Sequence, residues 1–190
     1  MLVPSYGTNL GKLFPLSWLD PGEAETGPRW VSASTSGLPI AGHVHLRRIR
    51  VSAGTYQTLR AMIGAVQGVT LTGTFFAVLD VVTGTQLVTT ADLSVPVAAV
   101  APSTVFSMSF TTPLVVVQEQ DYWIATLVAS AVTMPNLVQA TQLTALNNVS
   151  PALVQKMATL GQVTIPATIA AGGGLGGADG ATSFWYRLEP

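Results

Sequence analysis

The sequence predicts an all-β protein, a β-sandwich or jelly-roll-like domain that carries an extended N-terminal arm. Polar and apolar residues alternate over 104–111, which is typical of a strand with one buried face. The segment 122–128 is apolar at almost every position, which is typical of a strand covered on both faces, one that lies centrally in a sandwich or under a partner subunit. Short segments of both kinds are separated by turn residues about every 8 to 12 positions, a spacing that favours a sandwich or jelly roll.

The first 40 residues differ from the rest, so we assign 1–40 to the arm and 41–190 to the β-sandwich domain. The arm region contains five prolines and shows no lasting periodicity, which argues against an independent domain. It is also rich in large apolar residues, unlike a flexible linker. Such an arm either packs against its own domain or docks on a neighbouring subunit, and the sequence leaves both open. The candidate docking residues are Phe14, Trp18 and Trp30.

Strands are expected from residue 42 onward. In the first of them the parity of the apolar positions changes at Arg47-Arg48, which predicts a bulge. Residues 58–65 fit both a helical stripe and a strand, and the flanking glycines favour the strand. The inward candidates of the first strand are Val44, Leu46, Ile49 and Val51.

The middle of the chain reads as paired strands. Residues 74–80 are apolar on both faces, and Thr83-Gly84 predicts a hairpin turn before a returning strand over 86–90. Residues 91–102 are expected to form a loop, because they contain two prolines. Pro113 is expected to end the strand that begins at 104, since proline donates no ladder hydrogen bond.

After residue 128 the pattern weakens. Residues 137–140 and 143–146 predict short strands, and 151–160 predicts one or two helical turns. The Gly- and Ala-rich segment 170–180 predicts a mobile loop. The remaining expected strands are 162–169, despite Pro166, and 183–188.

Composition limits the classes of function. Only 9% of the residues are charged, against about 25% in a typical soluble protein. The scarcity of charge favours a surface that other subunits cover, and the two-faced strands supply interface candidates. A net charge of −1 gives no electrostatic footprint for nucleic acid. The subunit-interface candidates are Phe76, Val78, Tyr122 and Ile124.

The sequence gives no sign of secretion, membrane insertion or a disulfide framework. Residues 1–18 lack a basic start and a continuous apolar run, and no segment reaches the roughly 18 apolar residues of a membrane span. The chain contains no cysteine. We therefore expect synthesis in the cytoplasm and no insertion into a membrane.

No motif in the chain predicts chemistry. His43 and His45 share one strand face, but a third metal ligand would have to come from a distant carboxylate. Glu119 and Asp121 lie in one turn, whereas catalytic carboxylate pairs usually come from separate elements. The arginines at 47–50 and at 60 favour ion pairing or a solvated face. We expect no enzymatic activity, no catalytic residue, no cofactor and no metal.

Aromatic residues offer an alternative function, carbohydrate binding. Exposed rings stack on sugar faces, and Trp30, Trp123, Trp185 and Tyr186 are the candidates. For Trp123 the two-faced strand favours core packing instead. The alternative is therefore a carbohydrate-binding module for host cell-surface glycans that uses Trp185 and Tyr186.

A series of strand and turn patterns also carries a family resemblance. The segments that carry it are Leu71–Asp80, Gly84–Thr85, Thr89–Asp92, Phe110–Pro113, Tyr122–Ala125, Met134–Pro135 and Ala145–Asn148. In this order they resemble a repeated module in minor tail and fibre proteins of tailed bacteriophages, notably those of actinobacteria. The resemblance spans about residues 50–170, departs from the module at 95–102 and around Arg48, and includes no catalytic motif.

The resemblance implies a β-sandwich on a virion, used for structure or for attachment to the host surface. Its expected partners are other virion proteins, further copies of itself in a homo-oligomer, with a trimer favoured, and a host cell-surface glycan. Assembly would take place in the host cytoplasm.

Overall fold

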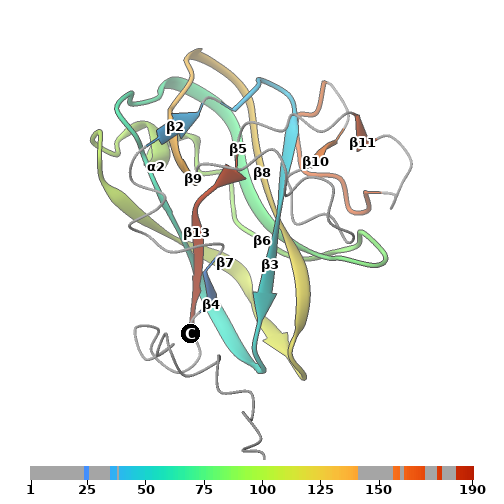
Figure 1. Ribbon diagram of the computed structural model, residues 1–190. Coiled ribbons are helices and arrows are strands. Elements are labelled where there is room, and N and C mark those ends of the chain that lie inside the picture. Colours follow the sequence, from blue (N-terminus) through green and yellow to red (C-terminus); the bar gives the residue numbers. More distant parts are fainter. Residues whose placement is uncertain are drawn as a thin grey trace, which may run out of the picture.

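The computed structural model describes residues 24–25, 35–37, 39–140, 156–158, 161–169, 175–176 and 183–190. These residues form strands and one short helix (Figure 1). The elements are β1 (Ala24–Glu25), β2 (Thr35–Gly37), β3 (Val44–Val51), β4 (Gly54–Met62), β5 (Val69–Asp80), β6 (Gln86–Thr89), α2 (Ser94–Ala98), β7 (Val105–Val116), β8 (Gln120–Thr133), β9 (Leu137–Ala140), β10 (Lys156–Ala158), β11 (Leu175–Gly176), β12 (Ser183–Phe184) and β13 (Tyr186–Glu189).

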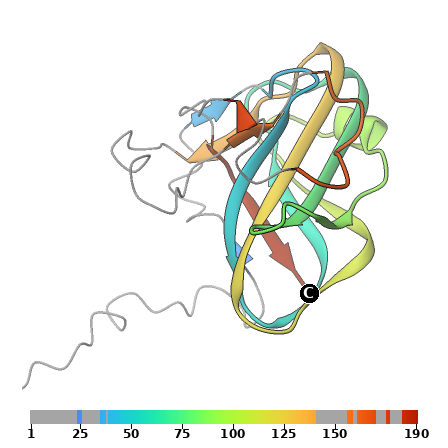
Figure 2. The same cartoon turned by 90° about the vertical axis from the view of Figure 1, so that its right-hand side faces the viewer.

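Two antiparallel sheets pack on each other, as Figures 1 and 2 show from two sides. The four-stranded sheet has the order β1-β13-β4-β7, and the six-stranded sheet has the order β11-β10-β3-β8-β5-β6. From β3 to β8 the chain changes sheet at every connection except the β5–β6 hairpin. These crossings between two antiparallel sheets are typical of a β-sandwich. The predicted all-β sandwich is therefore confirmed.

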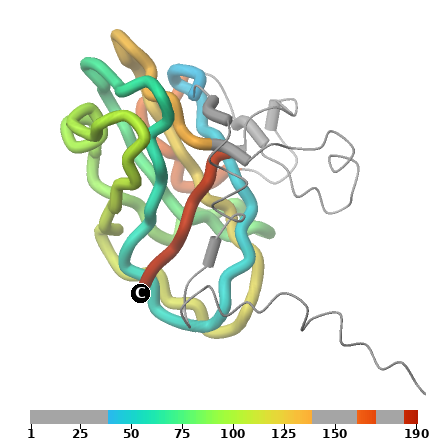
Figure 3. The backbone as a smooth tube through the Cα atoms, turned by 60° about the vertical axis from the view of Figure 1, so that its left-hand side comes forward, coloured from blue at the N-terminus to red at the C-terminus, as the bar shows by residue number. Residues whose placement is uncertain are grey.

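The C-terminal strand closes the four-stranded sheet. Figure 3 shows β13 (red) running beside β4, and the register pairs Tyr186 with Ala61 and Leu188 with Leu59. A third, small sheet has the order β12-β9-β2. The strand interpretation of residues 58–65 is confirmed as far as Met62, where β4 ends.

The inner core lies between the two large sheets. It takes alternate side chains from each strand, among them Leu59 from β4, Phe76 from β5 and Ile124 from β8. Burying one such side chain stabilises the fold by about 1.5–3 kcal/mol. The largest fully buried side chains of this core are Tyr56, Leu59, Ile63, Phe76, Ile124, Phe184, Tyr186 and Leu188.

The six-stranded sheet is also buried on much of its outer face, the face turned away from the four-stranded sheet. The residues 161–169, here called the strap, lie over this face. Gln162 N–H donates to the Gly42 carbonyl (2.8 Å), and Ile169 N–H donates to the Gly84 carbonyl (2.9 Å). The outer cluster beneath and within the strap consists of Val44, Leu46, Ala77, Leu79, Ala125, Leu127, Ile165 and Ile169.

The strap explains the change of parity in β3. The pairing of β3 with β8 is continuous from Val44 to Val51, so the bulge predicted at Arg47-Arg48 is wrong. Val44 and Leu46 belong to the outer cluster, whereas Ile49 and Val51 belong to the inner core. Both faces of the strand are apolar, each over a different half of its length, and the sequence pattern therefore shifts without a break in the ladder.

Further expectations are corrected. The strand that was expected to end at Pro113 continues past it, since β7 extends from Val105 to Val116. The predicted loop 91–102 contains the helix α2, and the expected helical turn within 151–160 is replaced at Lys156–Ala158 by β10. The strap, predicted as a strand, has only an isolated bridge between Thr168 and Thr85. The predicted strand at 143–146 lies outside the described residues, as does most of the predicted loop 170–180, whose described part forms the strand β11.

The described parts of the first 40 residues belong to the sandwich. Ala24 and Glu25 pair with Leu188 and Arg187 of β13, and Thr35–Gly37 pairs with β9. For these short segments the chain packs against its own domain, which is one of the two alternatives that the sequence left open. Phe14, Trp18 and Trp30 lie outside the described residues.

Candidate functional site

The predicted subunit-interface residues lie inside the molecule. Phe76, Val78, Tyr122 and Ile124 are buried in the inner core, where the four-stranded sheet of the same chain covers them. They cannot contact another subunit in this fold, and the prediction is corrected. The second apolar face of β5 and β8 is covered as well, because Ile165 and Ile169 of the strap pack on it.

The predicted glycan-stacking pair is also buried. Trp185 and Tyr186 each have 1% of their surface exposed, so neither ring is open to a sugar. The Tyr186 hydroxyl is hydrogen-bonded to the Thr126 hydroxyl within the core. Burial raises the pKa of Tyr186, while the Thr126 hydrogen bond and the nearby Arg47 oppose the rise. These residues hold the C-terminal strand in the sandwich.

The two histidines have structural surroundings. His45 is buried, its Nε2 accepts the Ile40 N–H (2.9 Å), and its ring meets Phe184 edge-on with centroids 5.5 Å apart. The His43 ring nitrogen Nδ1 lies 3.1 Å from the Ala41 carbonyl. Within the described ranges, no group of three histidine, cysteine or acidic side chains is placed to hold a metal ion.

The outer face carries the candidate site. In the ladder, Trp123 of β8 pairs with Arg48 of β3 on one side and with Leu79 of β5 on the other. Side chains at paired positions share a face of the sheet, so these three form one row across the outer face. Leu79 belongs to the outer cluster, and Trp123 packs against that cluster while staying partly exposed. Trp123 therefore contributes to the core with only part of its side chain, and the other part is exposed.

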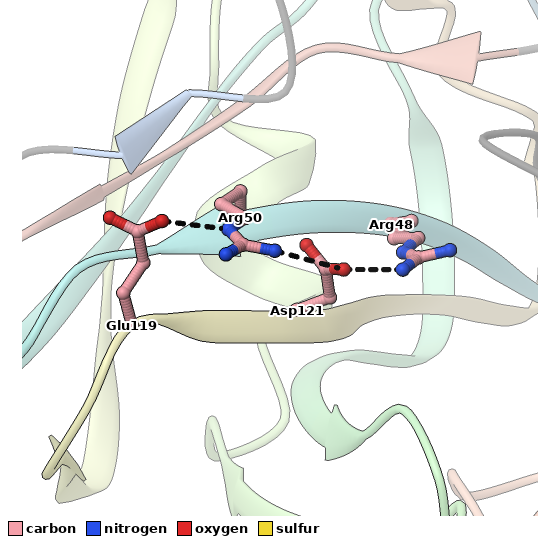
Figure 4. Close-up of polar contacts among 4 residues, drawn as sticks. All are labelled: Arg48, Arg50, Glu119 and Asp121. Atoms are coloured by element: carbon pink, nitrogen blue, oxygen red, sulfur yellow. Dashed lines mark hydrogen bonds and ion pairs between the residues drawn. The ribbon is translucent and has the colours of Figure 1, made fainter. Parts of the chain in front are cut away.

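Two ion pairs lie beside this row, near the end of β3 and the start of β8 (Figure 4). Arg48 Nη2 is bonded to Asp121 Oδ2, and Arg50 Nε donates to Glu119 Oε1 (2.8 Å). Arg50 Nη1 also lies 3.6 Å from Asp121 Oδ2, which links the two pairs into one network. Arg48 and Asp121 occupy diagonal positions of β3 and β8, and Arg50 lies directly opposite Asp121 in the ladder.

The two pairs differ in their exposure to solvent. The side chains of Arg48 and Asp121 are 14% and 17% exposed, whereas those of Arg50 and Glu119 are 62% and 55% exposed. The hydrogen bond to Glu119, followed by the charges of Asp121 and Glu119, raises the pKa of Arg50. The network contains two arginines and two carboxylates, so its formal charges sum to zero.

Sequence reasoning found these residues but assigned them separately. It expected ion pairing for the arginines and a turn for Glu119 and Asp121, and the structure brings the two groups together across β3 and β8. The fourth arginine of the cluster, Arg47, points into the sandwich, where burial lowers its pKa to about 10 and Tyr186 opposes the shift. In a strand, alternate positions share a face, so Arg48 and Arg50 lie on the face opposite to Arg47. This alternation is the sequence signal that could have separated them.

A scan of protein-family models and a search of curated proteins found no match to the chain. Among the described residues, no helix has the length and apolar character needed to cross a membrane.

Proposed function

We propose that the chain is a structural protein of a tailed-bacteriophage particle: a minor tail, fibre or decoration protein that contributes to host-surface attachment. Its role is to supply a stable β-sandwich to an assembly, with no catalytic step. The observation that carries the proposal is the correspondence between the phage-module resemblance and the central strands of the sandwich. The segment Leu71–Asp80 lies within β5, Tyr122–Ala125 lies within β8, and Gly84–Thr85 closes the β5–β6 hairpin.

The two-sheet β-sandwich is compatible with the same proposal, because viral capsid domains use double-sheet architectures. Lectin domains use them too, so the fold alone does not decide the function. The phage-module resemblance therefore carries more weight than the architecture, since its segments coincide with individual strands and turns.

The distribution of charge also favours an assembled state. Within the described residues, Arg48, Arg50 and Arg60 each pair with a carboxylate of the same chain. These pairings leave little unpaired charge to keep single copies apart in solution, a condition that favours association. We propose a homo-oligomer, with a trimer favoured. The partners are other virion proteins, which Phe14, Trp18 and Trp30 would contact.

Immunogold electron microscopy tests the proposal. An antibody raised against the full chain is applied to density-purified particles of the virus that encodes it. We expect gold at one defined position on intact particles. Gold absent from particles, with the protein found only in the soluble fraction of the lysate, would overturn the proposed function.

A further inference from the structure

At the Trp123 corner of the outer face, a partly exposed aromatic ring lies beside paired polar groups. Ile165 and Ile169 bury the aliphatic side chains of the outer cluster, whereas Trp123 remains partly exposed at its border. The Arg48–Asp121 pair lies next to Trp123, and the Arg50–Glu119 pair lies one position further along the strands. The surface thus passes from apolar to polar within two rows of the sheet.

The ion-pair network presents hydrogen-bond donors and acceptors in fixed positions. Guanidinium groups only donate hydrogen bonds, and carboxylates only accept them. Each guanidinium is held by a carboxylate, at 2.8 Å for Arg50 Nε and Glu119 Oε1. Pairing of this kind reduces the freedom of long side chains before any ligand arrives, which lowers the entropic cost of binding.

We propose that Trp123 and this network bind an uncharged sugar, a hexopyranose unit of a host surface glycan. The apolar C–H face of the ring would pack on the indole, which presents a large apolar surface. Each sugar hydroxyl both donates and accepts, so it matches the neighbouring carboxylate and guanidinium groups.

The charge balance selects this ligand class over two others. The two cations and two anions cancel, so the site offers no net charge to a phosphate or a uronate. A wholly apolar ligand would cover the charged groups without replacing their hydrogen bonds to water, which is unfavourable. A neutral molecule with many hydroxyls requires no net charge in the site, and it can replace the hydrogen bonds that the charged groups make to water.

The inference rests on the proposed function, because host attachment supplies the reason for a virion protein to bind a surface sugar. The two fail separately. Particles that carry the protein while the purified chain binds no sugar would remove only the glycan site. A sugar-binding chain that is absent from particles would remove only the virion assignment.

A glycan array and tryptophan-fluorescence titrations test the site with the purified full-length chain. The array carries neutral hexose glycans and anionic glycans, and the sugar that binds is then titrated as its methyl glycoside. We expect binding to neutral hexose glycans, and Trp123→Ala weakens it about tenfold or more, as for other central tryptophan contacts.

A second variant avoids the risk that Trp123→Ala disturbs the outer cluster. The double variant Arg50→Gln/Glu119→Gln changes two exposed side chains, so it folds normally and binds about threefold to tenfold more weakly. Arg60→Gln is the matched control, because it breaks the ion pair with Glu189 on the four-stranded sheet. We expect it to bind as the unchanged chain does. The proposal is overturned if no neutral glycan binds, if only anionic glycans bind, or if the Arg50/Glu119 variant binds normally.

Discussion

A β-carbon added to Gly84 would lie 1.7 Å from the carbonyl oxygen of Ile169. The end of the strap therefore lies directly against the β5–β6 turn, and no side chain fits between them. Gly84 also has a φ of +70°, a conformation that residues with a β-carbon rarely adopt. The Ile169 N–H donates to the Gly84 carbonyl (2.9 Å), so one glycine both forms the turn and holds the strap.

Gly84→Ala is expected to release the strap and destabilise the sandwich. The positive φ alone costs about 1–2 kcal/mol, and displacement of the strap adds to that cost. Gly161→Ala is the matched control, since Gly161 has a φ of +76° and a β-carbon there meets nothing within 4 Å. Urea unfolding of the two variants measures the difference. Equal losses of stability would show that the strap does not depend on Gly84.

Ile169→Ala is expected to lower the free energy of unfolding by about 2–4 kcal/mol, as is usual when a buried isoleucine is truncated. Ile169 is 8% exposed and belongs to the outer cluster. Val163 lies in the same strap but is 71% exposed, so Val163→Ala changes stability by less than about 0.5 kcal/mol. Chemical denaturation of both variants gives the comparison, and a similar effect at the two positions would mean that the strap contributes no burial.

Tyr186→Phe tests the polar contact inside the core. The variant removes the partner of the buried Thr126 hydroxyl, which costs about 1–3 kcal/mol. Thr126→Val removes the other side of the same bond. The double variant is expected to lose clearly less than the sum of the two single losses, because both remove one interaction. A strictly additive thermodynamic cycle would indicate that the two hydroxyls do not interact.

Asp92→Asn is expected to destabilise the protein at pH 7 but not in strong acid. Burial alone would raise the pKa of Asp92, but hydrogen bonds from Ser94, Thr74 and Gly73 outweigh it, and the pKa falls below the ordinary 3.8. Since the folded-state pKa is lowered, the carboxylate stabilises the fold above about pH 4, and this contribution is lost as the pH falls further.

The cost of Asp92→Asn at pH 7 is about 1 kcal/mol, a typical value for such hydrogen bonds, because solvent screens this exposed side chain. Urea unfolding of variant and unchanged chain at pH 7 and near pH 2 measures it. The two curves are expected to converge in acid. A difference that does not vary with pH would contradict the assigned role of the charge.

Strand periodicity predicted the sandwich because most of its strands bury alternate side chains. It also identified β5 and β8 as apolar on both faces, but it left open whether the sandwich itself or another subunit covers them. The four-stranded sheet covers the inner face, and the strap at 161–169, which is distant from both strands in sequence, covers the outer face. A local pattern shows that a face is buried, but it does not show which segment buries it.

The candidate site could be predicted only in part for the same reason. The arginines were expected to form ion pairs or a solvated face, and Glu119 and Asp121 were placed in a turn. Their pairing depends on the β3–β8 register, which joins positions about 70 residues apart. Trp123 and Trp185 were assigned the wrong way round: the first is partly exposed and the second is buried. Each tryptophan lies between two large apolar residues, so the local sequence does not distinguish them. Their exposure depends on where the strap and β13 lie in the fold.

The most direct test of the virion assignment is the copy number of the chain in purified particles. Quantitative mass spectrometry of density-purified, salt-washed particles measures it relative to the major capsid protein. The account predicts the same fixed number of copies in every preparation, a multiple of three if the oligomer is a trimer. A copy number near zero, or one that varies between preparations and falls with washing, would contradict it.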